Sequence, residues 1–129
     1  MAKKFQEWHT LKEDLHKSDK KVRFKEREIF WASIGVNIGF EQDGKGVILS
    51  RPVLILKKQN NNLFFGIPLS TKIKKGTFFF EFELNGKASS ALLVQGRTYD
   101  AKRLENKLGM MDKNDFDLLK LNFKKLLDL

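Results

Sequence analysis

The chain has 129 residues, of which 41% are hydrophobic, it contains no cysteine, and its formal net charge is +9. This length suits one domain with a single core, and the absence of cysteine excludes disulfides and thiolate metal sites. No apolar run approaches the ~18 residues of a membrane span. We therefore expect a cytoplasmic protein without a secretory signal. The charge indicates a polyanionic partner such as a nucleic acid, with a merely solvated basic surface as the alternative.

The N-terminal 24 residues are expected to form an amphipathic helix and a charged linker. Apolar residues recur at three- and four-residue spacing, which is typical of a helix with one apolar face: Phe5, Trp8, Leu11 and Leu15. The helix is expected over residues 3–17. Residues 18–28 are highly charged and have no apolar period, which indicates a linker or an extended arm.

The first half of the remaining chain has the pattern of strands around a long loop. Ile29–Val36 and the apolar run Pro52–Leu56 are typical of strands, the second covered on both faces. Between them, Asn37–Ser50 is a polar loop long enough to be functional or disordered. Gln59–Asn62 has the composition of a hairpin tip, and Leu63–Leu69 is the expected returning strand.

The next segments predict a second hairpin. A basic loop, Lys72–Gly76, precedes Thr77–Leu84, whose phenylalanines alternate with Glu81 and Glu83 as in a half-buried antiparallel strand. Asn85-Gly86 is a strong hairpin turn because both residues tolerate positive φ. The strand is expected to return over residues 90–95.

The C-terminal part predicts helices. Asp100 and Gly109 are suited to be the N-cap and C-cap of a short helix, and Asp112 is suited to cap the last helix. The last helix has one apolar face, with Leu127 beside it: Phe116, Leu119, Phe123 and Leu126. The whole pattern predicts a strongly bent antiparallel sheet or small barrel with helices at both termini.

Four short segments carry further information when they are taken together. They are Gly39-Phe40-Glu41-Gln42, Arg51-Pro52-Val53-Leu54-Ile55, Ile67-Pro68-Leu69-Ser70-Thr71-Lys72 and Gln95-Gly96-Arg97-Thr98-Tyr99-Asp100, the last followed by Lys102-Arg103-Leu104. In order and approximate spacing they resemble the PemK/MazF family of toxins from type II toxin–antitoxin systems. The resemblance runs from about residue 28 to the C-terminus.

The resemblance implies an α+β, mainly β fold, namely an SH3-like, strongly bent antiparallel barrel with a C-terminal helix and, in this chain, an extra N-terminal helix. It divides the chain into residues 1–24, the helix and linker, and residues 25–129, the barrel domain. It also implies an endoribonuclease that cuts single-stranded RNA without metal or cofactor and arrests growth. The adjacent 2′-hydroxyl attacks the phosphate and leaves a 2′,3′-cyclic phosphate (or 3′-phosphate) and a 5′-hydroxyl, a route closed to DNA.

The same resemblance implies three catalytic residues. Arg51 binds phosphate oxygens bidentately and stabilises the phosphorane charge, whereas proton transfer by an arginine requires an unusual environment. Ser70 aligns with the family's catalytic threonine, with Thr71 as the alternative because neighbouring strand residues point to opposite faces. Glu41 is expected to orient Arg51 or to accept a proton. Without the motifs, Arg51 would be a solvated residue before a strand-starting proline, Glu41 a solvated loop carboxylate, and Ser70 and Thr71 ordinary turn residues.

Other residues are expected to contact RNA or support the site. Gln42 is placed to read a base edge, and lysines are placed to contact phosphates in an RNA groove: Lys45, Lys57, Lys58, Lys72, Lys74 and Lys75. A solvated basic face is the alternative for any single lysine. Thr71, Gln95 and Arg97 are assigned supporting roles, and for Arg97 and Arg103 a structural role is equally open.

Two departures from the family pattern bear on mechanism. The loop before Arg51 is longer than in many members and includes Val47–Leu49, which is expected to form a short extra strand or to cover the site. Val94 occupies a position that is acidic in some members and is assigned there as a base. His9 and His16 offer no substitute, because a seven-residue spacing separates them by ~10 Å along a helix, and no acidic ligand pair accompanies them for a metal.

The resemblance also implies partners. Family members are homodimers that bind RNA in a groove across the interface, and a disordered antitoxin segment occupies that groove. An acidic peptide with apolar residues would complement the basic loops of this chain. Two other functions stay open: a toxin of the same fold that poisons gyrase by binding, and an inactive module that binds RNA or antitoxin.

Overall fold

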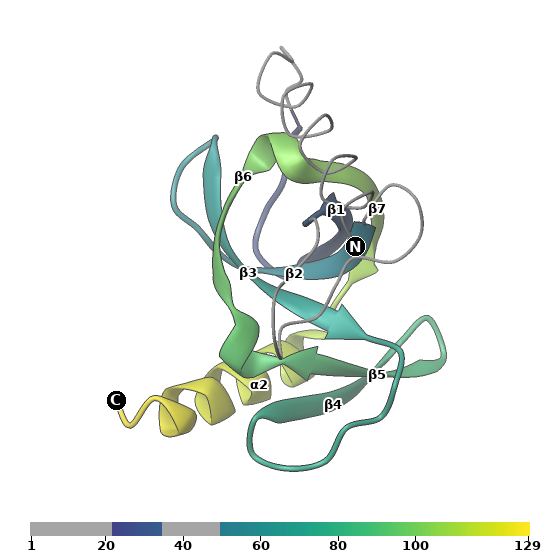
Figure 1. Ribbon diagram of the computed structural model, residues 1–129, viewed down its shortest axis with the longest axis vertical. Helices are drawn as coiled ribbons and strands as arrows, with labels where there is room; N and C mark the ends of the chain where they lie inside the picture. The colour runs from purple at the N-terminus through teal and green to yellow at the C-terminus, as the bar shows by residue number, and fades with distance from the viewer. Residues whose placement is uncertain (1–21, 35–49) are drawn as a thin grey trace, which may run out of the picture.

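The computed structural model describes residues 22–34 and 50–129, which form a mainly antiparallel β structure with a C-terminal helix (Figure 1). The strands are β1 (Glu28–Ser33), β2 (Ser50–Lys58), β3 (Leu63–Ser70), β4 (Phe79–Leu84), β5 (Lys87–Leu92), β6 (Arg97–Asp100) and β7 (Leu104–Met110). Two 3-10 turns, η1 (Leu93–Gln95) and η2 (Ala101–Arg103), flank β6, and the helix is α2 (Lys113–Leu126).

This architecture confirms the expected mainly β fold with a C-terminal helix. The expected helix over residues 3–17 and most of the loop from Asn37 to Ser50 lie outside the described residues. SH3-like closure of the barrel and the domain division at residue 24 stay predictions. No helix in the described part of the chain is long and apolar enough to cross a membrane.

Strand β3 organises the sheet, whose order is β4-β5-β3-β2-β1-β7 with β6 also on β3. One edge of β3 pairs with β2, while the other edge pairs first with β6 and then with β5. Its first half, Leu63–Gly66, pairs with β6, and its last residues, Leu69 and Ser70, pair with β5. The sheet therefore divides beside η1, which sends β4–β5 toward α2 and β6 toward β1 and β7 (Figure 1).

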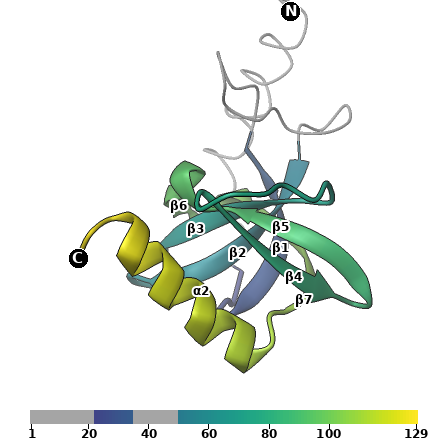
Figure 2. The same cartoon turned by 90° about the horizontal axis from the view of Figure 1, so that it is seen from below.

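The central strands are covered on both faces, as the apolar run Pro52–Leu56 predicts. Leu54 belongs to one apolar cluster, whereas its neighbours Val53 and Ile55 belong to the other, because successive strand residues point to opposite faces. The first cluster, called the helix-side core, consists of buried residues of α2 and of the sheet face that it covers: Ile29, Leu54, Ile67, Leu69, Phe80, Phe82, Ala91, Leu93, Met111, Phe116 and Leu119. Figure 2 shows α2 lying against this face of the sheet.

The second cluster, called the opposite core, lies on the other face of β2 and β3. Its members are Phe24, Phe30, Ala32, Ile34, Val53, Ile55, Phe64, Tyr99, Ala101 and Leu104. The ring of Phe24 lies 5.4 Å from that of Phe64. Part of the charged segment expected to be a linker or arm therefore packs against the sheet instead of leaving it.

Local signals place several element ends where the sequence predicts them. Asn85 and Gly86 have φ values of 52° and 79°, which confirms the hairpin turn. The Asp112 carboxylate accepts hydrogen bonds from the backbone N–H groups of Asn114 and Asp115, which confirms it as the N-cap of α2. The apolar face of α2 contacts the helix-side core as expected, while Leu127 is 50% exposed.

The expected helix between Asp100 and Gly109 is wrong. Asp100 caps only the single turn η2, with its carboxylate 2.8 Å from the Lys102 nitrogen, and the chain then extends as β7. β7 pairs with β1, and Leu104 at its start is fully buried. Tertiary pairing overrides the local cap signal because the β1 edge requires a partner for its backbone groups. The strand expected from Thr77 also begins later, at Phe79, and leaves Phe78 52% exposed.

Candidate active site

Arg51 lies near the start of β2 and is only 3% exposed. Its backbone pairs with that of Ala32 in β1. Its guanidinium donates a hydrogen bond of 3.1 Å to the backbone carbonyl of Leu69, near the end of β3. This bond directs the cation of Arg51 across to the C-terminal end of the neighbouring strand.

Ser70, the last residue of β3, lies at this same place. The Leu69 carbonyl that accepts the Arg51 bond belongs to the residue just before Ser70, and Ser70 is itself only 6% exposed. The β2–β3 pairs nearest this end are Val53 with Pro68 and Leu54 with Ile67. The expected residues Arg51 and Ser70 therefore lie at the same end of β2 and β3.

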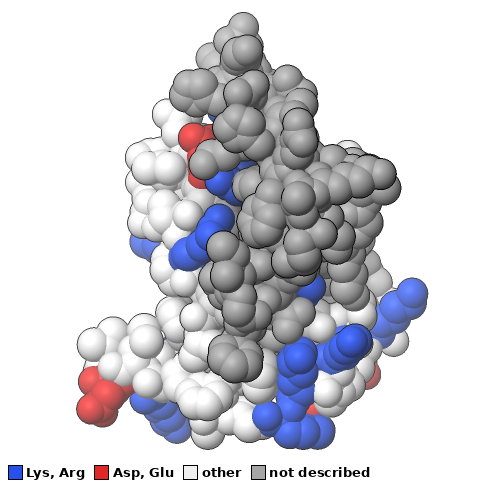
Figure 3. Space-filling view, in the orientation of Figure 1, with Lys and Arg blue, Asp and Glu red and all other residues white. Residues whose placement is uncertain are grey.

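The basic loop after β3 is anchored to this strand end by two serines. The Ser70 hydroxyl accepts a hydrogen bond of 3.2 Å from the Lys72 backbone, and the Ser90 hydroxyl accepts one of 3.1 Å from the Lys74 backbone. Ser90 is itself paired with Ser70 between β5 and β3. Lys72 and Lys75 are exposed beside the site, although Lys75 forms a 2.9 Å ion pair with Glu81. Figure 3 shows lysine and arginine side chains gathered over the β4–β5 part of this surface.

The whole described sheet and helix match one family. Residues 25–127 match the model of the "PemK-like, MazF-like toxin of type II toxin-antitoxin system". The chain belongs to this family. No sequence of a curated protein matched it.

Solved structures of similar fold include MazF toxins. MazF (Form-I) from Deinococcus radiodurans is 18% identical with a TM-score of 0.66, and the alignment covers 86% of this chain and 100% of that one. The Mycobacterium tuberculosis toxin MazF-mt6 is 18% identical with a TM-score of 0.61, covering 80% and 98%. An endoribonuclease in complex with its cognate antitoxin from a mycobacterial species is 11% identical with a TM-score of 0.63, covering 83% and 97%.

Several expected site residues of this PemK/MazF-family chain are not brought to Arg51. Lys57 lies toward the other end of β2, six residues or ~20 Å along the strand from Arg51, and its ammonium is 3.5 Å from the Glu26 carboxylate. Lys58 donates to the backbone carbonyl of Phe24. Neither lysine lies beside the Arg51–Ser70 pair.

Other expected residues are placed as follows. Thr71 is exposed in the turn after Ser70, and Gln95 is half-buried in η1. Lys74 is half-buried, with its ammonium 5.8 Å from the centre of the Phe79 ring. A last set lies outside the described residues: Glu41, Gln42 and Lys45. No group of three or more His, Cys, Asp or Glu side chains in the described part is arranged to hold a metal ion.

Sequence reasoning missed a carboxylate near the start of β2. Ser50, the residue before Arg51, donates a hydrogen bond of 2.6 Å to the Glu105 carboxylate of β7. Ser50 and Arg51 point to opposite faces, so Glu105 lies across the sheet from the guanidinium. Glu105 was expected inside a helix, and its position became visible only once β7 paired with β1.

Sequence reasoning also missed Tyr99, the single tyrosine of the chain. It is 3% exposed, and burial raises the pKa of its hydroxyl while the positive charges of Arg97, Arg103 and Arg51 act to lower it. Burial lowers the pKa of Arg103, and the like charge of Arg97 acts in the same direction. The fourth family segment contains these residues, but their convergence depends on how β6 packs.

Proposed function

We propose that this PemK/MazF-family toxin is an endoribonuclease that cuts single-stranded RNA without a metal ion. The supporting observation is the hydrogen bond from the buried Arg51 guanidinium to the carbonyl of Leu69, the residue before Ser70, where β2 and β3 share one end. A guanidinium held in a place of low water content interacts strongly with a phosphate whose charge is increasing. A hydroxyl beside it adds a neutral donor to the same charge.

The proposed reaction uses the RNA as its own nucleophile. The 2′-oxygen forms a bond to phosphorus, the bond from phosphorus to the 5′-oxygen breaks, and the products are a 2′,3′-cyclic phosphate and a 5′-hydroxyl. The proton of the 2′-hydroxyl passes to a base, for which Glu41 is the proposed residue, and the leaving 5′-oxygen takes up a proton from that side chain or from water. Arg51 stabilises the phosphorane by bidentate hydrogen bonding.

Ser70 is proposed to donate its hydroxyl hydrogen to a phosphorane oxygen. The Ser70 oxygen already accepts the Lys72 N–H, so its own hydrogen is directed away from that bond. Lys72 and Lys75 lie on the loop that starts at this serine, where they are proposed to contact RNA phosphates. Gln42 and Lys45 are proposed to add base and phosphate contacts.

The partners are proposed by analogy with the family. Relatives of this chain have been crystallised as MazE–MazF complexes and with a cognate antitoxin. We propose a homodimer whose basic surface, near Lys72 and Lys75, binds either RNA or an acidic antitoxin segment.

The test is cleavage of a synthetic single-stranded RNA in the presence of EDTA. Wild type is expected to cut RNA, to leave matched DNA and 2′-O-methyl RNA intact, and to produce 5′-hydroxyl ends. Arg51→Ala is expected to lose about 10²–10³-fold in rate, and Ser70→Ala should lose less, with Ser70→Thr retaining activity. Ser89→Ala is the matched control, since Ser89 is also a buried serine.

Three outcomes would contradict parts of this proposal. Cleavage that survives Arg51→Ala removes Arg51 from the centre of the site. Growth arrest with intact cellular RNA favours a toxin that acts by binding a protein. Tight RNA binding by wild type with no cleavage favours the inactive module.

A further inference from the structure

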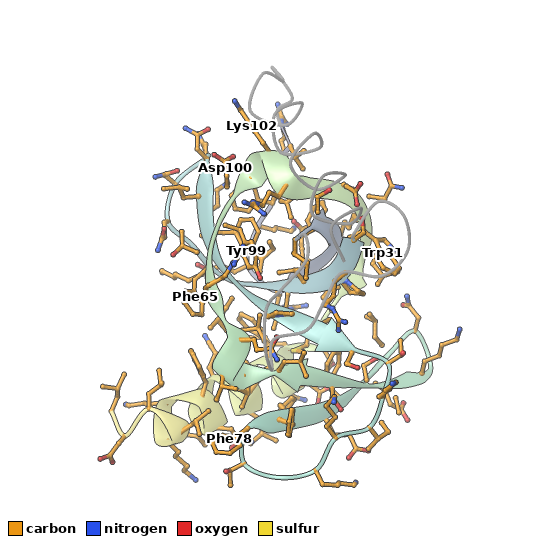
Figure 4. The ribbon with its side chains drawn as sticks, viewed as in Figure 1. Trp31, Phe65, Phe78, Tyr99, Asp100 and Lys102 are labelled. Atoms are coloured by element: carbon orange, nitrogen blue, oxygen red, sulfur yellow. The ribbon has the colours of Figure 1, made fainter. Side chains whose placement is uncertain are left out.

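Three arginines act on Tyr99, namely its sequence neighbours Arg97 and Arg103 and the distant Arg51. Arg97 and Tyr99 are two residues apart in β6, so their side chains share one face of the strand. The tyrosine ring stacks on that of Phe64, with ring centres 5.6 Å apart. Figure 4 shows Tyr99 pointing from β6 toward the interior between β6 and the central strands. Its ring therefore crosses from β6 onto the face of β3.

A glycine makes this crossing possible. Gly66 is opposite Arg97 in the β3–β6 pair. A Cβ at Gly66 would lie 2.6 Å from Val53, 2.7 Å from Phe64 and 3.1 Å from the Tyr99 ring. The missing side chain lets the tyrosine ring lie across β3 close to Val53, which is two residues from Arg51 on the same face of β2.

Two further guanidinium groups are fixed around this ring. That of Arg97 lies 4.8 Å from the centre of the Tyr99 ring. Arg103, from η2, donates a 3.3 Å hydrogen bond to the backbone carbonyl of Ser33, next to Ala32, the residue paired with Arg51. Within the described residues, no carboxylate forms an ion pair with Arg97.

Positive charge from three arginines acts on the Tyr99 hydroxyl. Arg97, Arg103 and Arg51 all act to lower the pKa of this hydroxyl against the effect of burial. Arg97 and Arg103 also repel each other, since the charge of the first lowers the pKa of the second, and the Asp100 carboxylate offsets only part of the lowering of the Arg103 pKa. A fold that holds like charges together around a buried neutral donor is suited to an anion that neutralises them.

We propose that Arg97, Tyr99 and Arg103 form a phosphate subsite that binds the RNA phosphodiester next to the one at Arg51. This rests on the proposed function for its ligand, single-stranded RNA. Arg97 and Arg103 contact the phosphate oxygens with their forked N–H donors. Tyr99 is a positioning residue, whose ring and hydroxyl fix the two guanidinium groups relative to Arg51.

The test measures binding of a short, fluorescent 2′-O-methyl RNA of random sequence, which the proposed reaction leaves intact, over a series of salt concentrations. Each lost phosphate contact on a single strand reduces the slope of log affinity against log salt by about 0.7. Arg97→Gln is expected to reduce the slope by this amount and the affinity about tenfold. Arg97→Lys should keep the slope but lose affinity, because the charge stays and the fork is lost.

The matched control is Lys124→Gln, which removes an exposed positive charge from the last turn of α2 and should leave the slope unchanged. Tyr99→Phe keeps the ring and removes the hydroxyl, so it should weaken binding severalfold at an unchanged slope. Arg97 is exposed, so Arg97→Gln is informative even if a substitution of the half-buried Arg103 prevents folding.

Cleavage of ordinary RNA, measured in parallel, separates the two proposals. If Arg97→Gln lowers the slope but no variant or wild type cuts RNA, the subsite stands and the nuclease is wrong. If wild type cuts RNA while Arg97→Gln and Lys124→Gln have equal slopes, the nuclease stands and the subsite is overturned. Wild type that does not bind the probe overturns the subsite, and Tyr99→Phe that binds like wild type removes the positioning role.

Discussion

The two apolar cores on either side of β2 and β3 are closed in different ways. The helix-side core is closed by α2, which contributes the buried apolar residues Phe116 and Leu119. The opposite core is bordered by polar groups, because Tyr99 and Arg51 are almost fully buried on that face. Neighbouring residues of one strand, such as Val53 and Leu54, serve the two sides separately. One face of the sheet is thus available for stability alone, and the other combines packing with concentrated positive charge.

The largest expected effects come from comparing one substitution on each face of the sheet, Leu119→Ala and Arg51→Ala, for stability and for RNA cleavage. Leu119→Ala removes a fully buried side chain and should lower the free energy of unfolding by about 2–5 kcal/mol. The folded fraction should retain its RNA-cleaving rate. Arg51→Ala should do the reverse, with a rate loss of about 10²–10³-fold and a smaller fall in the free energy of unfolding. Urea unfolding and cleavage assays on both variants check this, and equal losses of both properties in each variant would contradict the division.

Gly66→Ala tests the point where packing and charge meet on the opposite face. The added Cβ would overlap Val53, Phe64 and Tyr99, so overpacking should destabilise the fold by about 1–3 kcal/mol. It should also displace the Tyr99 ring and weaken RNA binding by the folded protein. Gly86→Ala is the contrasting control, because nothing lies within 4 Å of its Cβ, so its strain from φ of 79° should leave RNA binding unchanged. Equal RNA affinity in the Gly66→Ala and Gly86→Ala proteins would contradict this account of Gly66.

Asp112→Ala tests the helix side in a milder way. Loss of the N-cap leaves the Asn114 and Asp115 N–H groups without their carboxylate and should lower stability by about 1 kcal/mol. Asp112→Asn should restore most of the loss, since an amide oxygen also caps a helix. Differential scanning calorimetry of the three proteins measures it, and an Asn variant as unstable as the Ala variant would show that charge rather than capping is responsible.

The smallest expected effect concerns the ionisation of Tyr99. Its pKa is raised by burial, so the protonated form is favoured in the folded protein, and its contribution to stability is present below the usual pKa of 10.0 and is lost as the pH rises above it. Because the chain has a single tyrosine, the ultraviolet absorbance of tyrosinate reports this group alone. The folded protein should titrate at higher pH than the urea-unfolded protein, and Tyr99→Phe should lose less stability than wild type between neutral and alkaline pH. Coincident titration curves would contradict the raised pKa.

The parts of this structure that were predictable from sequence are those specified by local chemistry. Asn85-Gly86 and Asp112 fix a turn and a helix start through their own backbone and side-chain preferences, and the apolar run after Arg51 marks a strand covered on both faces. The segment after Asp100 was misjudged because its conformation is set by pairing with β1, a partner far away in the sequence. Local cap signals carry no information about such an edge.

The candidate site divides in the same way. Arg51 and Ser70 were proposed from family motifs, and the Arg51 hydrogen bond to the Leu69 carbonyl puts its guanidinium at the end of β3 where Ser70 lies. The convergence around Tyr99 was not foreseen, because it depends on a ring passing over Gly66 and on η2 bringing Arg103 next to β1. Neither contact produces a regular spacing of residues that could be recognised in the sequence.

Because β6 and β5 share one edge of β3, the length of β3 sets the distance between the two groups of basic residues. The strand holds β6 through Gly66 and β5 through Ser70, four residues or ~13 Å farther along. The strand therefore fixes the distance between the cluster of Arg97, Tyr99 and Arg103 and the basic loop Lys72–Gly76. Inserting or deleting one residue between these points would change the interval by ~3.3 Å and turn Ser70 to the other face of the sheet. The stretch from Gly66 to Ser70 is consequently fixed in length, while the loop beyond it is free to vary in length without altering the spacing of the two anchor points.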